Sequence, residues 1–180
     1  MAHPFKHFCV ITRHRHKVIY HCFKAGIFWQ GLFHDLSKYT PTEFIPGAKY
    51  FLGTRSPNEV EREKHGYSKA WMHHKGRNRH HFEYWTDYNF KTKRIEPVDM
   101  PDRFIIEMFC DRVAASKTYL GKDYTKDHPL NYFLRSKPTR VITQTTSDKI
   151  ELLLAYLAKH GETETFEFIK RHKKTGLPVK

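Results

Sequence analysis

The spacing of apolar residues along the chain predicts a protein built almost entirely from helices. Ile150, Leu153 and Leu157 recur at intervals of three and four residues, which places them on one face of a helix. No stretch shows the strict alternation of apolar and polar residues that is typical of a strand, and residues 86–99 are polar and irregular. Helices are expected near residues 10–25, 28–38, 41–51, 57–75, 78–85, 100–120, 129–135, 150–160 and 163–173.

Two short motifs mark positions where helices begin. Residues 40–43 read Thr-Pro-Thr-Glu, and residues 56–59 read Ser-Pro-Asn-Glu. In both motifs a hydroxyl side chain can cap the helix, proline suits the first helical position, and glutamate completes a capping box. The chain is long enough to bury a sizeable core. We therefore predict one all-α domain over residues 1–180, with a core over about 8–135 and a C-terminal helical extension over about 145–175.

Composition excludes several classes of protein. Hydrophobic residues make up 39% of the chain and aromatic residues 15%, which is too many for a disordered chain. No run of 18 apolar residues is present, and the first residues lack the uninterrupted apolar stretch of a secretory signal. The 3 cysteines form no CxxC pair, which argues against a disulfide scaffold or a cysteine-rich zinc site. We expect a cytoplasmic protein without membrane association.

The net charge of the chain limits the classes of partner that it is expected to bind. The formal net charge is +13 with histidine counted as neutral. Such a balance favours a partner rich in phosphate, which includes a small phosphate-containing molecule such as a nucleotide and also nucleic acid. A basic, solvated surface without a partner is the alternative, and charge alone does not choose between them.

Histidine is unusually frequent, with 14 residues. His34 and Asp35 are adjacent, and His14 lies on the apolar face of its predicted helix together with His21. Imidazole and carboxylate together suit zinc, manganese, iron, cobalt or nickel, and magnesium where carboxylate dominates. A hydrogen-bonded structural histidine is the alternative for His14, and His16 and His21 compete with it for any role as a ligand.

Asp111 lies within an apolar run that predicts a buried helix. Apolar residues surround it on nearly every face between Phe104 and Leu120. A carboxylate in such a place is costly unless it binds a metal ion or pairs with a cation. Arg15 is one cation that could pair with it, so a metal site and a buried ion pair are both open.

The order of these residues along the chain suggests a family. His14 is followed four residues later by Val18, and the pair His34-Asp35 opens the segment HDLSK. A histidine-rich segment and then Asp111 follow. This order resembles the HD superfamily of metal-dependent hydrolases. The resemblance implies an HD-domain-like helical bundle in which His14, His34, Asp35 and Asp111 hold a divalent metal ion.

Members of that family with two metal ions carry further histidines between the His-Asp pair and the last aspartate. His73, His74, His80 and His81 occupy this part of the chain. The resemblance implies that two of them bind metal, and we favour His74 and His80, with His73, His81 and His21 as alternates. Two solvated basic clusters are the alternative. One or two ions per chain are expected, drawn from Mn, Zn, Fe, Ni, Co and Mg.

A closer resemblance covers about residues 8–135. The segments 34–44 (HDLSKYTPTEF), 71–81 (WMHHKGRNRHH) and 107–111 (EMFCD) resemble a narrower group of bacterial and phage-borne proteins that has no established activity. Three features depart from the HD pattern. Ser37 stands where glycine is usual, only 20 residues separate His14 from His34, and no GYP motif follows the histidines. The last departure argues against a cyclic-di-GMP phosphodiesterase.

The resemblance implies hydrolysis of a phosphate ester, either a nucleotide or a related monoester or diester, by a metal-activated water. Asp35 would ligate the metal and orient the water, and Lys38 would offset the charge of the phosphate. Arg77 and Asn78 suit a phosphate and a sugar hydroxyl. Two other functions stay open: a di-iron oxygenase of the HD type, and a non-catalytic, basic nucleic-acid-binding protein.

Overall fold

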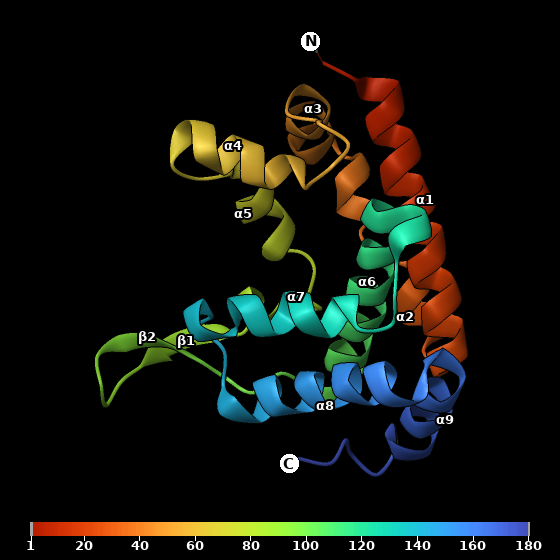
Figure 1. The fold of residues 1–180 in the computed structure, drawn as a ribbon. Helices are drawn as coiled ribbons and strands as arrows, with labels where there is room; N and C mark the ends of the chain where they lie inside the picture. Colours follow the sequence, from red (N-terminus) through yellow and green to blue (C-terminus); the bar gives the residue numbers. More distant parts are fainter. Residues whose placement is uncertain (1, 180) are drawn as a thin grey trace.

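The computed structural model describes residues 2–179. It confirms that the protein is mostly helical and also contains one small hairpin (Figure 1). The α-helices are α1 (Pro4–Ala25), α2 (Phe28–Leu32), α3 (Pro41–Lys49), α4 (Pro57–His65), α5 (Lys69–Lys75), α6 (Asp102–Leu120), α7 (His128–Ser136), α8 (Gln144–His160) and α9 (Glu162–His172). Short 3-10 helices are η1 (Leu36–Tyr39), η2 (Phe82–Tyr84), η3 (Gly121–Asp123) and η4 (Lys137–Thr139), and the strands are β1 (Thr86–Asn89) and β2 (Arg94–Pro97). None of the helices in residues 2–179 has both the length and the apolar character required to span a membrane.

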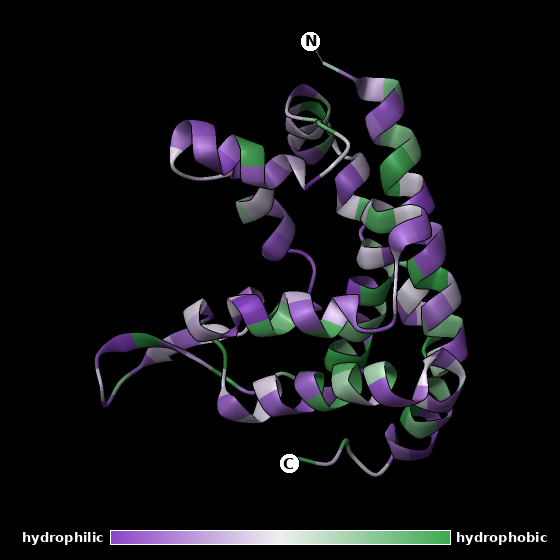
Figure 2. Ribbon diagram, viewed as in Figure 1, coloured by the Kyte–Doolittle hydropathy of each residue, from purple (hydrophilic) through white to green (hydrophobic). Residues whose placement is uncertain are grey.

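Helix α6 lies at the centre of the core, as its apolar sequence predicts. Ile105, Phe109 and Val113 have no exposed surface. Helix α6 packs against α1 and α8, and Figure 2 shows hydrophobic stretches on these helices. A polar side chain that projects from α6 toward α1 is therefore held in a fixed place deep in the molecule.

The C-terminal helices complete the same core. Helix α8 packs on α6, and α9 packs on both α8 and α1. Leu153, Phe166 and Ile169 belong to one apolar cluster with Val18 and Phe109. The core thus extends beyond residue 135, because the apolar face of α8 covers one side of α6. Residues of the predicted C-terminal extension over 145–175 thus contribute to the same core as α6.

Several elements differ from the sequence expectations. The helix expected over 28–38 ends at Leu32, and the chain turns before η1. The helix expected over 57–75 is two helices, because Gly66 ends α4 in the left-handed region with φ 78°. The helix expected over 78–85 is reduced to η2.

Residues 86–97 form an antiparallel hairpin where irregular structure was expected. Thr86 pairs with Pro97, and Asn89 pairs with Arg94. The Asn89 side chain closes the turn by accepting hydrogen bonds from two backbone N–H groups within it. The hairpin projects from the body of the molecule in Figure 1, so neither of its faces packs on the core. Its strands therefore lack the alternation of apolar and polar residues that marks a strand with one buried face.

Candidate metal centre

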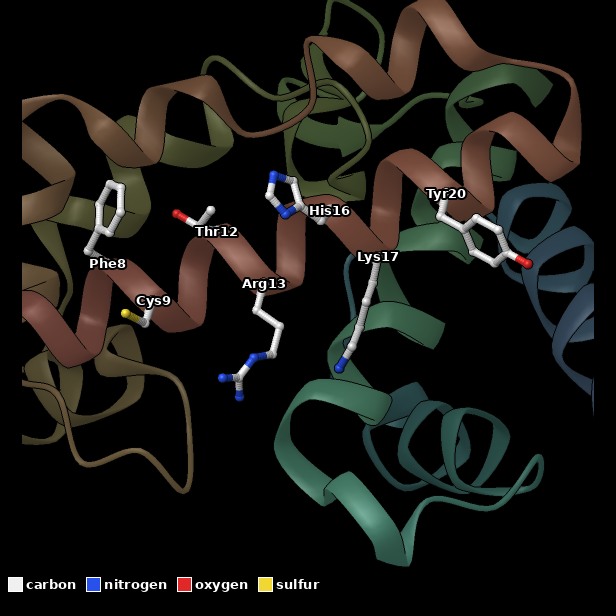
Figure 3. A pocket seen from close by; sticks show the side chains of 7 residues that line it. All are labelled: Phe8, Cys9, Thr12, Arg13, His16, Lys17 and Tyr20. Atoms are coloured by element: carbon white, nitrogen blue, oxygen red, sulfur yellow. The ribbon is translucent and has the colours of Figure 1, made fainter.

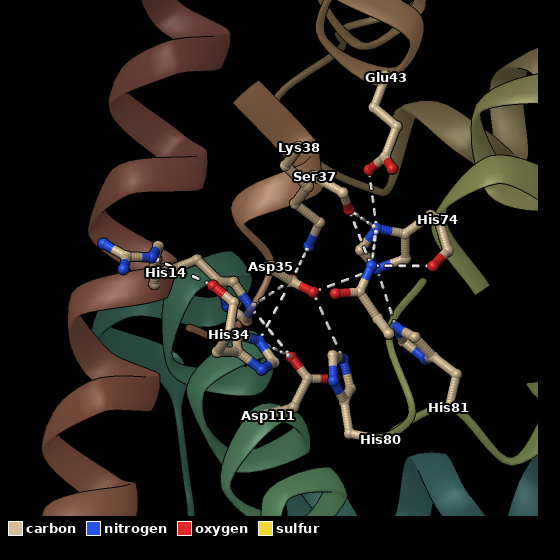
Figure 4. Close-up of polar contacts among 12 residues, drawn as sticks. His14, His34, Asp35, Ser37, Lys38, Glu43, His74, His80, His81 and Asp111 are labelled. Atoms are coloured by element: carbon tan, nitrogen blue, oxygen red, sulfur yellow. Dashed lines mark hydrogen bonds and ion pairs between the residues drawn. The ribbon is translucent and has the colours of Figure 1, made fainter. Parts of the chain in front are cut away.

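Side chains from distant parts of the chain converge in the interior of the molecule (Figure 4). They are His14 from α1, His34 and Asp35 from the turn between α2 and η1, His74 from α5, His80 and His81 from the turn before η2, and Asp111 from α6. His34, Asp35, His74 and His80 are each 2% exposed or less. The site therefore lies inside the fold rather than on its surface.

The turn at Asp35 directs two neighbouring side chains to one point. Asp35 has φ 54° and ψ 25°, which is the left-handed region. Aspartate tolerates this region better than most residues with a side chain. A continuous helix would separate the directions of His34 and Asp35 by about 100°. The left-handed turn removes that separation, so both side chains reach the same place.

Two contacts hold this turn. Helix α2 approaches α1 so closely that a Cβ on Gly31 would lie 2.4 Å from the Cβ of Cys22, which requires glycine. The Arg15 guanidinium donates hydrogen bonds to the backbone carbonyls of Leu32 and His34. The hydrogen bonds of the Arg15 guanidinium are thus made to the backbone of the turn. In the described part of the chain, the ion pairs of Asp111 are with histidines and none is with Arg15.

The first ligand group comprises His14, His34, Asp35 and Asp111, with one donor atom from each lying within 4.8 Å of the others. Asp111 Oδ1 lies 3.0 Å from His14 Nε2 and 3.6 Å from His34 Nε2. Asp35 Oδ2 lies 3.2 Å from His34 Nε2. Two ligands about 2.1 Å from one ion lie about 3.4 Å apart at a tetrahedral angle, so this group has the spacing to hold a metal ion.

The second ligand group comprises Asp35, His74, His80 and His81. Asp35 Oδ1 lies 3.3 Å from His74 Nε2 and 3.5 Å from His80 Nε2. His81 Nε2 lies 2.9 Å from His74 Nε2. Asp35 therefore offers Oδ2 to the first group and Oδ1 to the second. His81, an alternate in the sequence analysis, stands beside the favoured His74 and His80.

Glu107 holds two of these histidines from behind. Its Oε1 lies 2.8 Å from His34 Nδ1 and 3.1 Å from His80 Nδ1, where each ring can donate a hydrogen bond. A histidine protonated at Nδ1 turns the free electron pair of Nε2 the other way, toward Asp35. Burial would raise the pKa of Glu107, but the bonds from His34 and His80 hold it at about 2. Carboxylates in this position commonly orient histidines that bind metal.

Glu43 has the same role for His74. Its Oε2 accepts a hydrogen bond from His74 Nδ1 at 2.8 Å, and its Oε1 accepts one from His73 Nδ1 at 2.6 Å. His73 is thereby held outside both ligand groups. The sequence analysis gave Glu107 no role and gave Glu43 only a capping role. The capping role was wrong, because the Thr40 side chain makes no capping hydrogen bond and the Glu43 carboxylate binds the two histidines instead. The available signal for Glu107 was its place four residues before Asp111, which puts both side chains on one face of α6.

Among the described residues, five inward-facing atoms of the two groups lack hydrogen bonds, whereas Nε2 of His74 and Nε2 of His81 contact each other. Within residues 2–179, His14 Nε2, His34 Nε2, His80 Nε2 and both carboxylate oxygens of Asp35 are buried and make no hydrogen bond of good geometry. Buried polar atoms without such a partner are costly. A metal ion in each group would supply the missing partner. The residues thus fit a metal centre in both donor type and arrangement.

The charges of the site also favour bound cations. Four carboxylates meet here, those of Asp35, Asp111, Glu43 and Glu107, and Lys38 Nζ lies 2.6 Å from Asp35 Oδ2. Burial would lower the pKa of Lys38, but the Asp35 carboxylate outweighs that effect and raises it, so Lys38 stays charged. One ammonium group does not balance four carboxylates. Burial would lower the pKa of His34, but the nearby Asp35 carboxylate raises it well above its usual value, so the site favours positive charge.

Comparison with known proteins places the chain in a family. The sequence profile described as "Family of unknown function (DUF5662)" matches residues 3–160. The chain belongs to this family. A search of curated proteins and a search of solved structures found no match. The match includes every member of both ligand groups, because all of them lie between residues 14 and 111.

Arg77 and Asn78, the residues predicted to bind substrate, make contacts within the protein. The Asn78 side-chain amide donates to Ser37 Oγ and to the His74 carbonyl, both at 2.8 Å. It thus fastens α5 to η1, and its N–H groups are used within the protein. Arg77 is exposed, and its guanidinium contacts the His73 carbonyl at 3.5 Å. Neither residue lies in the two ligand groups.

His16 and His21, the two histidines of α1 that compete with His14, lie outside both ligand groups. His16 is exposed on the outer face of the helix, where it lines a hollow of about 580 Å³ together with Arg13 and Lys17 (Figure 3). His21 is buried, its Nδ1 lies 3.4 Å from the Cys110 carbonyl, and its ring stacks on Phe166. Of the three competing histidines, only His14 lies in a ligand group.

The buried His21 predicts a pH dependence of stability. Burial, with a smaller contribution from Lys117, lowers the pKa of His21 to about 4, whereas an unfolded histidine titrates near 6.5. Between these values the unfolded chain binds the extra proton, so stability falls as pH falls through that window. The shift corresponds to about 3 kcal/mol. Urea unfolding of wild type and of His21→Phe between pH 4.5 and 7.5 should show a shallower slope for the variant, and equal slopes would contradict this assignment.

Proposed function

We propose that this protein is a metal-dependent phosphohydrolase of the HD type. The observation that carries the proposal is the position of Asp35, which offers one carboxylate oxygen to each of two ligand groups. The resemblance of the residue order to the HD superfamily supports it, and so does the buried site on an all-helical scaffold. A centre that accepts two ions side by side is suited to phosphate esters, because it can contact both the attacking and the leaving oxygen.

Each side chain of the site has a distinct task in this proposal. A bound divalent ion would polarise a phosphoryl oxygen and lower the pKa of a water molecule. Asp35 orients the attacking water between the two groups, and Lys38 offsets the charge of the phosphate. The water oxygen forms a new bond to phosphorus, the ester P–O bond breaks, and the alcohol leaves with the proton. Glu107 and Glu43 keep the ligand histidines in the required tautomer.

The donor set favours transition metals. The second group presents three imidazoles and one carboxylate, and the first presents two of each. Imidazole suits zinc, iron, cobalt and nickel, whereas magnesium prefers sites made of oxygen ligands. We therefore expect zinc, iron, manganese, cobalt or nickel ahead of magnesium, with two ions per chain.

Elemental analysis followed by a substrate panel tests the proposal. We expect close to two ions per chain and hydrolysis of phosphate esters after loading with manganese, zinc, nickel, cobalt, iron or magnesium in turn. Less than about 0.2 ions per chain under every loading condition would overturn it, because a catalytic centre needs at least one site filled. Oxygen consumption by the iron-loaded protein without phosphate release would instead support the oxygenase.

Binding of nucleic acid without metal is the remaining alternative. Such binding would weaken steeply with salt and would survive chelation. Metal-dependent turnover that a chelator abolishes and that re-addition of the ion restores would exclude this alternative as an account of the site.

Lys38→Ala should reduce turnover and leave the metal content unchanged. The Lys38 side chain is 28% exposed, and its ammonium group pairs with only one carboxylate of the ligand groups, so its loss removes charge that would face the phosphate. The expected loss in kcat/KM is about 10–1000-fold, as for removal of one electrostatic donor. Lys38→Arg, which keeps the charge, should recover part of the loss. Lys122→Ala, an exposed lysine in η3, is the matched control. Loss of metal from Lys38→Ala would contradict this role.

A further inference from the structure

A small cavity shares a wall with the candidate metal centre. It measures about 120 Å³ and lies between α1, α3, α4 and α5 and the end of α6. Lys38, His74 and His81 form the wall next to the ligand groups. The other walls include His7, Phe51 and Tyr119. The cavity therefore adjoins the second ligand group through His74 and His81, and Asp35 through Lys38.

The size of the cavity limits what it can hold. Pockets for drug-sized ligands or cofactors measure about 300–1,000 Å³, and a cavity of about 150 Å³ accommodates benzene. In proportion to benzene, a cavity of about 120 Å³ has room for about five heavy atoms, which is enough for the glycerol part of a small ester but not for a ribose with its base. The phosphoryl group would be held at the ligand groups, so the cavity volume restricts the alcohol part of the ester.

His7 contributes a polar ring to the cavity wall, and neither ring nitrogen makes a hydrogen bond among the described residues. The residue is 6% exposed, its Nδ1 is buried, and its Nε2 lies beside Gly47, which also lines the cavity. Its ring lies between Phe44 and Phe51, and a Cβ on Gly47 would come within 2.3 Å of Nε2, so the ring has little freedom to turn. A buried nitrogen without a partner is costly unless a ligand atom satisfies it.

We infer that this cavity binds the alcohol part of the substrate and restricts the enzyme to small phosphomonoesters that carry a hydroxyl or similar polar group for His7. The inference rests on the proposed function and narrows it. Nucleotides, which the basic charge and the resemblance suggested, are then poor substrates. Lys38 stands between the two parts, since it contacts Asp35 and also lines the cavity.

The test compares three esters of increasing size: methyl phosphate, glycerol 2-phosphate and adenosine 5′-monophosphate. In the metal-loaded wild type we expect glycerol 2-phosphate to have the highest kcat/KM and adenosine monophosphate to be turned over poorly. Phe51→Ala enlarges the cavity and should raise the kcat/KM for adenosine monophosphate relative to glycerol 2-phosphate by about 10–200-fold, the range for a change in pocket size. Phe90→Ala, at an exposed position on the hairpin turn, is the control and should change nothing.

A second variant tests the polar contact of His7 with the substrate separately from the volume of the cavity. His7→Phe keeps an aromatic ring and removes both nitrogens, so it should raise KM for glycerol 2-phosphate about 10-fold and leave methyl phosphate unaffected. His7→Gln retains a hydrogen-bonding group and should restore part of the affinity. Titration calorimetry with the same three esters gives a readout that does not depend on turnover.

The outcomes distinguish this inference from the proposed function. Equal turnover of adenosine monophosphate and glycerol 2-phosphate by the wild type would overturn the small cavity as the substrate pocket and leave the hydrolase intact. An unchanged preference in Phe51→Ala would do the same. Calorimetric binding of glycerol 2-phosphate that depends on His7, without turnover of any ester, would support the cavity and overturn the hydrolase.

Discussion

Asp35→Asn should abolish hydrolysis and remove most of the metal from both ligand groups while the fold survives. Asparagine has the same size and also tolerates the left-handed region that Asp35 occupies at φ 54°, so the turn after α2 is preserved. It has lost the negative charge and one of the two oxygens, and each oxygen faces a different group. Elemental analysis should show less than half of the wild-type metal, and phosphate release should fall below detection.

The matched control is Asp123→Asn, an exposed aspartate in η3, which should retain full activity and metal content. Circular dichroism of both variants checks the fold. Activity that is unaffected by Asp35→Asn would mean that the reaction occurs elsewhere or comes from a contaminant, and the assignment of the site would be wrong.

Chelation should lower the melting temperature of the wild type by about 10 °C. The ions would link α1, α5, α6 and the turn after α2, and a ligand that binds only the folded state adds about 4 kcal/mol when its concentration is 1,000 times Kd. For a chain of this size, each kcal/mol shifts the melting temperature by about 2–4 °C. Differential scanning calorimetry with and without chelator measures the shift.

Variants of single ligand residues should show how much each ligand group contributes to the shift in melting temperature. Asp111 belongs only to the first group and His74 only to the second. Asp111→Ala and His74→Ala should therefore each lose about one ion per chain and part of the shift caused by chelation. Melting curves that coincide with and without chelator in the wild type would contradict a preformed metal centre.

The strongest local patterns of the sequence predicted much of the helical scaffold. The apolar run around Phe109 identified the buried α6, and the amphipathic pattern from Ile150 to Leu157 identified α8. Both are long segments in which burial of one face or of all faces dictates the residue type at each position. The Ser-Pro-Asn-Glu motif likewise placed the start of α4, because a cap is decided by neighbouring residues.

The members of the candidate site were also largely named in advance. His14, His34, Asp35 and Asp111 do lie together in the first group, and His74 and His80 lie together in the second. His21 and His73 could not be excluded by spacing alone. His21 stacks on Phe166 of α9, and His73 is hydrogen-bonded to Glu43. Both contacts join residues that are far apart in the sequence.

The sequence by itself determined a mostly helical protein with a buried α6 and named the candidate metal ligands, because helix formation and burial follow from local periodicity. Only the tertiary structure decided that the helix after Phe28 stops at Leu32, where Arg15 and the close approach of α2 to α1 turn the chain. That turn gives Asp35 its left-handed conformation and lets its two oxygens face two groups. Which carboxylates stand behind the ligands, and how small the adjoining cavity is, depend on packing between distant segments, which local periodicity does not encode.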